Sequence, residues 1–128
     1  MLSRCIEEAD KIPKTHGRHR LFSIVTDKRG RVLGQGHNDY NKTSPVQKKY
    51  GSKFTSEDAQ YLHSECRAII KSKGKGYRIY VGRVTNSGKQ GLAKPCLSCM
   101  AIIQNETDIK EVIYSISDNE HGIIKIVR

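Results

Sequence analysis

The sequence predicts an α/β domain in which helices pack on a sheet of five strands, giving a two- or three-layer sandwich. Segments with apolar residues at helical spacing alternate along the chain with short segments rich in β-branched residues. The chain has 128 residues, which is enough for one hydrophobic core and too few for two ordinary domains. We therefore expect one domain over residues 1–128.

The first part of the chain is predicted to form a helix and two antiparallel strands. Apolar residues recur every three or four positions over residues 2–12, and Pro13 ends this pattern. LFSIVTD (21–27) and RVLGQG (31–36) are typical of strands, and the short KRG segment between them indicates a hairpin. Residues 37–55 are mostly polar and show no clear period, which predicts a long loop.

The next part is predicted to add two helices around a strand. Apolar side chains at helical spacing predict a helix from Ser56, which carries the HSEC segment and ends in the GKG segment at 74–76. The alternating segment YRIYVGRVT (77–85) predicts a third strand. Pro95 is suited to begin a short helix that continues to about Gln104, because its missing N–H is not needed in a first helical turn.

The last two predicted strands are EVIYSIS (111–117) and GIIKIV (122–127). Only about five residues, DNEHG, lie at their junction. A parallel crossover needs roughly a dozen residues or more, so these strands are expected to be antiparallel neighbours.

The composition limits the partners and the location of the protein. The formal net charge of +10 attracts anions such as nucleotide phosphates, nucleic acid or an acidic protein. No segment approaches the roughly 20 apolar residues that span a bilayer, and the N-terminus lacks the apolar stretch of a signal peptide. We therefore expect a cytoplasmic protein without a membrane partner.

The cysteines indicate a metal site. In a reducing compartment, a set of four cysteines is more typical of metal binding or catalysis than of disulfides. A catalytic zinc ion takes three protein ligands, often imidazole and thiolate, and keeps one position open. His63, Cys96 and Cys99 provide such a set, and the start of the predicted helix at PCLSC favours the thiolate form of its cysteines.

Glu65 is the candidate acid–base residue beside this metal. In a continuous helix the side chains of His63 and Glu65 would point about 200° apart, so they converge only where the helix begins. We therefore expect the chain to bend, or to start its regular turn, near His63. Glu65 would then take a proton from the water that the metal activates and deliver it to the leaving ammonia.

The two motifs HSE (63–65) and PCLSC (95–99) resemble the signature of the cytidine and deoxycytidylate deaminase superfamily, H-x-E followed by P-C-x-x-C. The resemblance implies a cytidine deaminase-like α/β/α sandwich with a mixed five-stranded sheet, zinc on His63, Cys96 and Cys99, and Glu65 as proton shuttle. It also implies a homo-oligomer. The YSISDNEHGIIKI ending is similar to that of deaminase-like proteins of phages and large viruses.

The resemblance also identifies two candidate substrate-binding residues. The family has an asparagine after its second strand that contacts the sugar, and Asn38 in GQGHN is in that place. Ser64 replaces the alanine that commonly separates the motif histidine and glutamate, and it is the second candidate. The long polar segment before the HSE motif could meet a substrate phosphate through Lys42, Lys48 or Lys49.

Three functions remain open from the sequence. The first is zinc-dependent hydrolytic conversion of cytosine to uracil in a nucleoside or nucleotide. The resemblance favours this small substrate, because the short last connection is similar to that of the family branch with an antiparallel final strand, which includes free-nucleoside deaminases. The second is editing of cytosine or adenine in a single-stranded polynucleotide, which the positive charge favours. The third is a non-catalytic nucleic-acid-binding module, in which Cys66 joins the other three ligands and closes a structural zinc site.

Overall fold

The computed structural model of the chain describes residues 1–15, 18–54 and 61–128. Its helices are α1 (Leu2–Asp10), α2 (Pro45–Phe54), α3 (Ser64–Ser72) and α4 (Leu97–Glu106). Its strands are β1 (Arg20–Thr26), β2 (Val32–His37), β3 (Arg78–Val84), β4 (Gln90–Gly91), β5 (Glu111–Ser117) and β6 (Glu120–Lys125). None of the helices in these ranges is long and apolar enough to cross a membrane.

The strands form one mixed sheet in the order β2-β1-β3-β5-β6. The β3–β5 pair is parallel, and the β1–β2, β1–β3 and β5–β6 pairs are antiparallel. The predicted mixed sheet with an antiparallel final strand is therefore confirmed. The two-residue strand β4, which pairs with the end of β3, was not predicted from the sequence.

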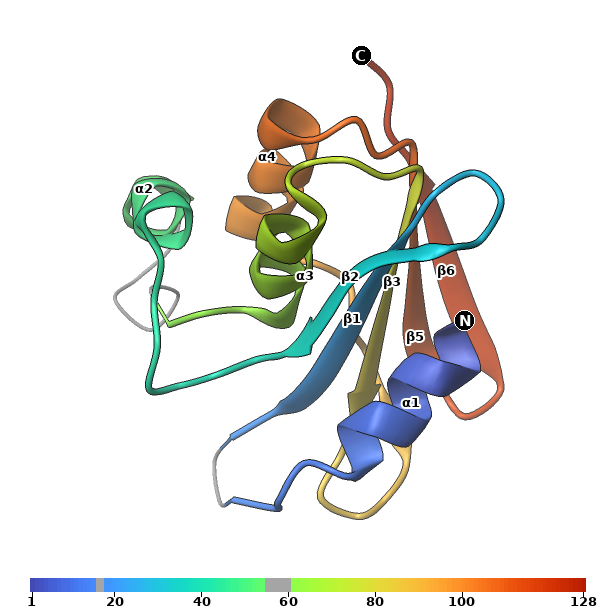
Figure 1. The fold of residues 1–128 in the computed structure, drawn as a ribbon. Helices are drawn as coiled ribbons and strands as arrows, with labels where there is room; N and C mark the ends of the chain where they lie inside the picture. The colour runs from blue at the N-terminus through green and yellow to red at the C-terminus, as the bar shows by residue number, and fades with distance from the viewer. Residues whose placement is uncertain (16–17, 55–60) are drawn as a thin grey trace.

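Helices cover both faces of the sheet (Figure 1). α1 packs on one face, where Cys5 and Ala9 contact a small core that includes Phe22, Ile24 and Val84. α3 and α4 cover the other face and, with the strands, enclose the larger core. α2 lies beyond them, beside α4 (Figure 1). The expected α/β/α sandwich is confirmed.

The prediction of a loop over residues 37–55 is wrong, because α2 occupies Pro45–Phe54. The hydroxyl of Ser44 accepts a hydrogen bond from the N–H of Gln47 at 3.0 Å, as an N-cap does. The side chains that α2 buries include Gln47 and Tyr50, which are polar or amphipathic. The helix therefore lacks the apolar period by which helices are recognised in a sequence.

The helix predicted from Ser56 begins later, at Ser64, with His63 as its N-cap. The first five residues of the predicted helix, 56–60, lie outside the described residues. Leu62 is held in extended conformation, since its N–H donates to the carbonyl of Lys42 at 2.7 Å and its carbonyl accepts from Asp39 at 2.8 Å. The expected start of the regular helix near His63 is thus confirmed.

α3 lies very close to the edge strand β2. A Cβ atom added at Gly34 would be 2.7 Å from the backbone nitrogen of Ser72 and would also overlap the carbonyl oxygen of Ala68. Real side chains do not tolerate such distances to backbone atoms. Glycine at position 34 therefore allows α3 to pack directly on the strand backbone.

Candidate zinc and active site

Three predicted metal ligands meet where two helices begin. His63 is the N-cap of α3, Cys96 is the N-cap of α4, and Cys99 lies in the first turn of α4. Nδ1 of His63 is 3.2 Å from Sγ of Cys99 and 3.7 Å from Sγ of Cys96. The ligand atoms of the three residues all lie within 4.8 Å of one another. The fold therefore brings the ligand residues of the two motifs together as a compact group of three donors.

The chemistry of this group fits zinc. A hydrogen bond from Cys99, followed by bonds from His63 and Ser98, lowers the pKa of Cys96 to about 3 despite burial. The same thiol pair raises the pKa of Cys99, and burial raises it further. A divalent cation bound by the two sulfurs would favour the thiolate form of both. One imidazole and two thiolates with a fourth position open is the ligand set of a catalytic zinc site.

Cys66 is not part of this group of ligands in the described residues. It is buried in the larger core, and its Sγ lies 3.6 Å from the hydroxyl of Ser44. Burial raises the pKa of the Cys66 thiol, which favours its neutral form. These observations favour the three-ligand site over the closed four-ligand one.

Glu65 lies beside the metal ligands at the start of α3, where only 4% of its surface is exposed. Ser64 Oγ donates a hydrogen bond to Glu65 Oε1 at 2.7 Å, and the hydroxyl of Ser23 on β1 lies 2.8 Å from Ser64 Oγ. Burial raises the pKa of Glu65, while the charge of His63 and the Ser64 hydrogen bond lower it in part. A buried carboxyl group with a raised pKa is suited to accept and donate protons in catalysis.

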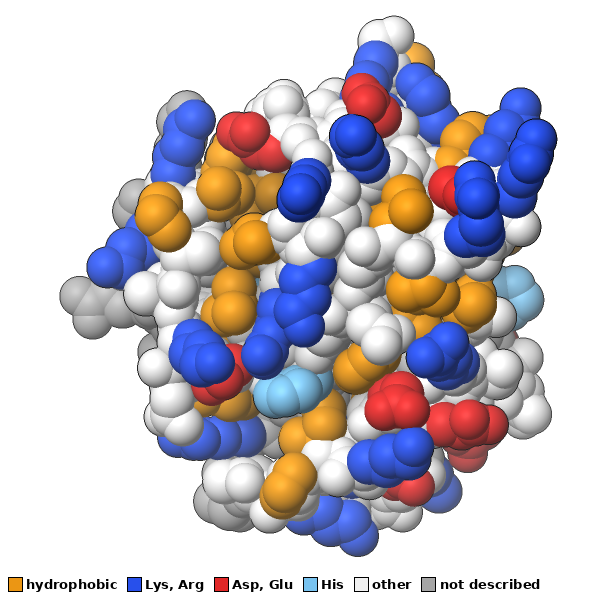
Figure 2. Space-filling model, viewed as in Figure 1, with side chains coloured by type: hydrophobic (Ala, Val, Ile, Leu, Met, Phe, Trp, Pro, Cys, Tyr) orange, Lys and Arg blue, Asp and Glu red, His pale blue; other side chains and the backbone are white. Residues whose placement is uncertain are grey.

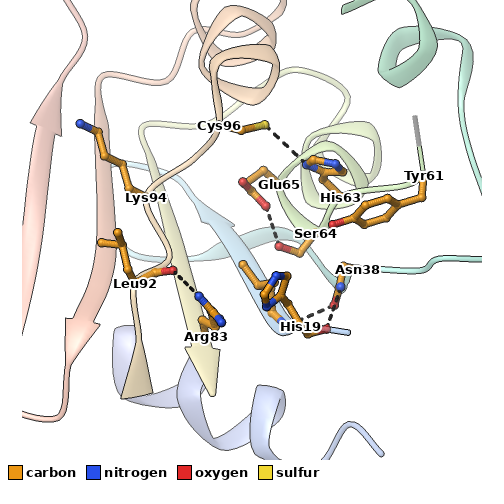
Figure 3. Close-up of a pocket in the computed structure, with 11 residues that line it drawn as sticks. His19, Asn38, Tyr61, His63, Ser64, Glu65, Arg83, Leu92, Lys94 and Cys96 are labelled. Carbon is orange, nitrogen blue, oxygen red and sulfur yellow. Dashed lines mark hydrogen bonds between the residues drawn. The ribbon is translucent and has the colours of Figure 1, made fainter. Parts of the chain in front are cut away.

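A cavity of about 150 Å³, open to solvent, lies over these groups. Five of the six predicted site residues line it, namely Asn38, His63, Ser64, Glu65 and Cys96, and Cys99 is the third member of the ligand group. Figure 3 shows the side chains of Glu65 and His63 close together, with Asn38 and His19 on the opposite side of the cavity.

Asn38 is fixed by the backbone of the segment that leads into β1. Its Oδ1 accepts from the N–H of Leu21 at 3.1 Å, and its Nδ2 donates to the carbonyl of His19 at 3.0 Å. The side chain is buried yet lines the cavity. One amide hydrogen and one oxygen lone pair remain for a ligand.

Several residues of the cavity wall were not predicted from the sequence. They are His19, Leu21, Tyr61, Arg83, Leu92 and Lys94. They come from four separate segments that only the sheet order brings together, so no local motif identifies them. The lysines proposed to meet a phosphate, Lys42, Lys48 and Lys49, are not among the residues of the described chain that line it.

The ring of Tyr61 lies between the rings of His63 and Tyr40. Its ring centroid is 4.5 Å from that of His63 and 4.2 Å from that of Tyr40. The guanidinium of Arg18 lies 4.9 Å from the centroid of Tyr40 on the outer side. Stacking of this kind restricts the orientation of the His63 ring.

Comparison with known proteins agrees with the resemblance seen in the two motifs. Residues 1–116 match the family model described as cytidine and deoxycytidylate deaminase zinc-binding region. The sequence matches no curated protein.

Solved structures of cytidine deaminases have a similar fold. The protein from Burkholderia pseudomallei superposes with a TM-score of 0.61 at 14% identity, covering 97% of this chain and 88% of that chain. The protein from Mycobacterium tuberculosis gives a TM-score of 0.52 at 17% identity, covering 90% of this chain and 80% of that chain. Its E47Q mutant gives 0.51 at 19% identity, covering 90% and 81%.

At such identities the structural neighbours establish the fold, and the family model establishes the family, because it matches nearly the whole chain including both motifs. The donors that meet at the starts of α3 and α4 are the residues of those motifs. The chain therefore belongs to the family of cytidine and deoxycytidylate deaminases.

Proposed function

We propose that this protein is a zinc-dependent hydrolytic deaminase that converts cytosine to uracil in a pyrimidine nucleoside or nucleotide. The observation that carries the proposal is the buried carboxyl group of Glu65, which shares one open cavity with the metal ligands His63 and Cys96. A structural zinc site needs neither a cavity nor a buried acid beside it.

His63, Cys96 and Cys99 are the residues that would hold the zinc ion. Zinc in such a site supplies a Lewis acid that lowers the pKa of a water molecule toward neutrality. The remaining chemistry is a proton transfer, which falls to the protein.

Glu65 is the proposed proton carrier. It would accept a proton from the attacking water as the new C–O bond forms at the amidine-like ring carbon. It would then deliver that proton to the exocyclic nitrogen as the C–N bond breaks and ammonia leaves. Ser64 holds the carboxyl in place through its 2.7 Å hydrogen bond, so its proposed contact with substrate is combined with a positioning role.

The cavity wall would orient the nucleoside. Asn38 has an amide hydrogen and a lone pair free for a sugar hydroxyl, since the backbone uses only the other two. Leu21, Leu92 and Tyr61 offer apolar surface to the base. Such a division between polar and apolar walls is typical of small-molecule sites.

The test is ammonia release by the zinc-loaded protein from cytidine, deoxycytidine, their monophosphates and adenosine. Glu65→Gln is expected to lower turnover by about 10²- to 10⁴-fold with the zinc content unchanged. Glu120→Gln, a substitution of the same type on the exposed part of β6, is the matched control and is expected to have no effect. Loss of activity in both variants, or in neither, would contradict the role of Glu65.

Two further properties belong to the same proposal. The four cysteines are free thiols, which supports a reducing compartment such as the cytoplasm. The family resemblance supports assembly into a homo-oligomer, which sedimentation of the zinc-loaded protein would measure. A monomer at all accessible concentrations would contradict the second property.

A further inference from the structure

A second hollow adjoins the cavity on the side away from the metal ligands. His19 and Arg83 line both, and the second hollow is otherwise formed by Arg18, Val84, Thr85 and Asn86. Figure 3 shows Arg83 and His19 close together, below Glu65 and Ser64. A ligand that fills the cavity can therefore extend into the second hollow.

The guanidinium of Arg83 makes few interactions with the protein. Its only hydrogen bond among the described residues is a long one, 3.5 Å from Nη1 to the carbonyl of Leu92. Nε is buried and has no hydrogen-bond partner among them. Arg83 is also absent from the ion pairs of the described chain. A buried donor without an acceptor is costly, so this one is suited to a ligand.

Other arginines of the sheet make more interactions with the protein, although Nε of Arg20, like that of Arg83, is buried without a hydrogen-bond partner among the described residues. Arg20 donates to the carbonyls of Asp10, Ile12 and Thr85 at 2.7–3.1 Å. Arg78, at the other end of β3, pairs with Glu111 at 3.6 Å. Arg83 therefore differs from its neighbours in having its charge available on the cavity side.

The protein fixes Arg83 in this orientation. Its backbone N–H donates to the hydroxyl of Ser115 at 3.1 Å, which holds the end of β3. A Cβ atom at Gly91 would lie 3.2 Å from Cδ of Arg83, so the glycine in β4 leaves the space through which the side chain passes. The position of the guanidinium thus follows from the sheet.

We propose that Arg83, with Arg18 and His19, binds the phosphate of a pyrimidine nucleoside monophosphate whose base lies in the cavity beside Glu65. This assignment rests on the proposed deaminase function and narrows its substrate from nucleosides and nucleotides to the nucleotide. An arginine with unused donors recognises phosphate through two parallel N–H···O bonds. Arg18 adds a second positive charge at the outer side of the hollow.

His19 contributes a neutral contact. Burial lowers its pKa, and the nearby charge of Arg83 lowers it further. The uncharged ring does not repel Arg83 and has one N–H to donate.

A single nucleotide fits this arrangement better than a strand. A polynucleotide needs cations on both sides of the base to follow successive phosphates. The remaining described walls of the cavity include Leu21, Leu92 and Tyr61, and the side chain of Lys94 points away from Glu65 and His63 (Figure 3). On the face of the molecule that Figure 2 shows, Lys and Arg side chains are scattered among apolar and uncharged ones.

The test compares kcat/KM for cytidine, deoxycytidine, their 5′-monophosphates and a cytosine-containing single strand. The zinc-loaded protein is expected to prefer a monophosphate over its nucleoside by at least about 10-fold. Arg83→Gln should lower kcat/KM for the monophosphate by about 10- to 100-fold, the range of a charge-assisted hydrogen bond, and for the nucleoside by less than about 3-fold. The kcat/KM of Arg83→Lys for the monophosphate should lie between the values of the original protein and Arg83→Gln.

Arg78→Gln is the matched control, because it removes the same charge from the same strand on the opposite face of the sheet. It should leave the preference for the monophosphate unchanged. Equal efficiency with nucleoside and monophosphate, equal losses in the two glutamine variants, or a preference for the strand over the monophosphate would overturn the assignment.

Binding distinguishes this assignment from the deaminase proposal. Calorimetry should show that cytidine 5′-monophosphate binds more tightly than cytidine, that inorganic phosphate competes with it, and that Arg83→Gln removes the difference. If this pattern holds but nothing is deaminated, the phosphate site stands and the deaminase function fails. If cytidine is deaminated but the monophosphate gains no affinity from Arg83, the phosphate site fails and the deaminase function stands.

Discussion

The two faces of the sheet have opposite effects on the pKa of a cysteine side chain. Cys5, on the α1 face, is buried among apolar side chains, and burial raises its pKa to about 12. Cys96, on the α3 and α4 face, has a pKa lowered to about 3 by hydrogen bonds from Cys99 and His63. Both are free thiols. The contrast shows how differently the two faces act on a cysteine thiol, and among the described residues only the face with α3 and α4 brings cysteines together with a histidine.

The largest expected effect tests this contrast directly. Cys99→Ser removes one of three donors and should weaken zinc binding by more than about 100-fold, beyond the loss typical of a change outside the ligands. Cys5→Ser should retain the full zinc content, because it lies on the other face. Chelator competition with a zinc-sensitive dye measures both. Retention of zinc by the Cys99 variant would contradict the three-ligand site.

The core of the α1 face should affect stability without affecting chemistry. Ile24→Ala removes a fully buried side chain and should lower the free energy of unfolding by about 2–4 kcal/mol. Its zinc affinity and KM should stay within about 2-fold of the original values, since neighbouring side chains of a strand point to opposite faces. Urea unfolding and steady-state kinetics give the two values. A large rise in KM would show that the faces are coupled.

On the opposite face, a substitution of Ser64 should affect the reaction rate, unlike the substitution of Ile24. Ser64→Ala removes the hydrogen bond to Glu65 and should lower kcat by about 10-fold, the equivalent of about 1.4 kcal/mol. The free energy of unfolding should also fall, by about 1 kcal/mol, because the buried hydroxyl of Ser23 loses its hydrogen-bond partner. Ser64→Thr keeps a hydroxyl and should restore part of the rate. No change in kcat would exclude a positioning role for Ser64.

The smallest expected effect lies at the β1–β2 turn, away from both cores. Hydrogen bonds from the backbone N–H groups of Arg31 and Arg29 lower the pKa of Asp27, with a further contribution from the Arg31 side chain. A lowered folded pKa contributes stability above the unfolded value of 3.8, and this contribution is lost as the pH falls through the folded pKa. Asp27→Asn should therefore lower Tm slightly at pH 6 and less at pH 3.

The fold and the motif residues could be predicted because their signals are local. Strand segments alternate or are rich in β-branched residues, and the two motifs place their donors at helix starts. α2 could not be predicted, because the side chains it buries include Gln47 and Tyr50. Arg83 and Leu92 could not be assigned to the site, because their approach to Glu65 depends on sheet order and on the path of β4.

The close contact of α3 with Gly34 determines where the residues at the start of α3 lie relative to the other metal ligands. The helix rests on bare strand backbone, so the smallest added side chain would act as a spacer beneath it. His63 and Glu65 belong to the start of that helix and would be displaced with it, whereas Cys96 and Cys99 belong to another helix and would stay. A single methyl group far from the chemistry would thus open a gap between the two halves of the metal site.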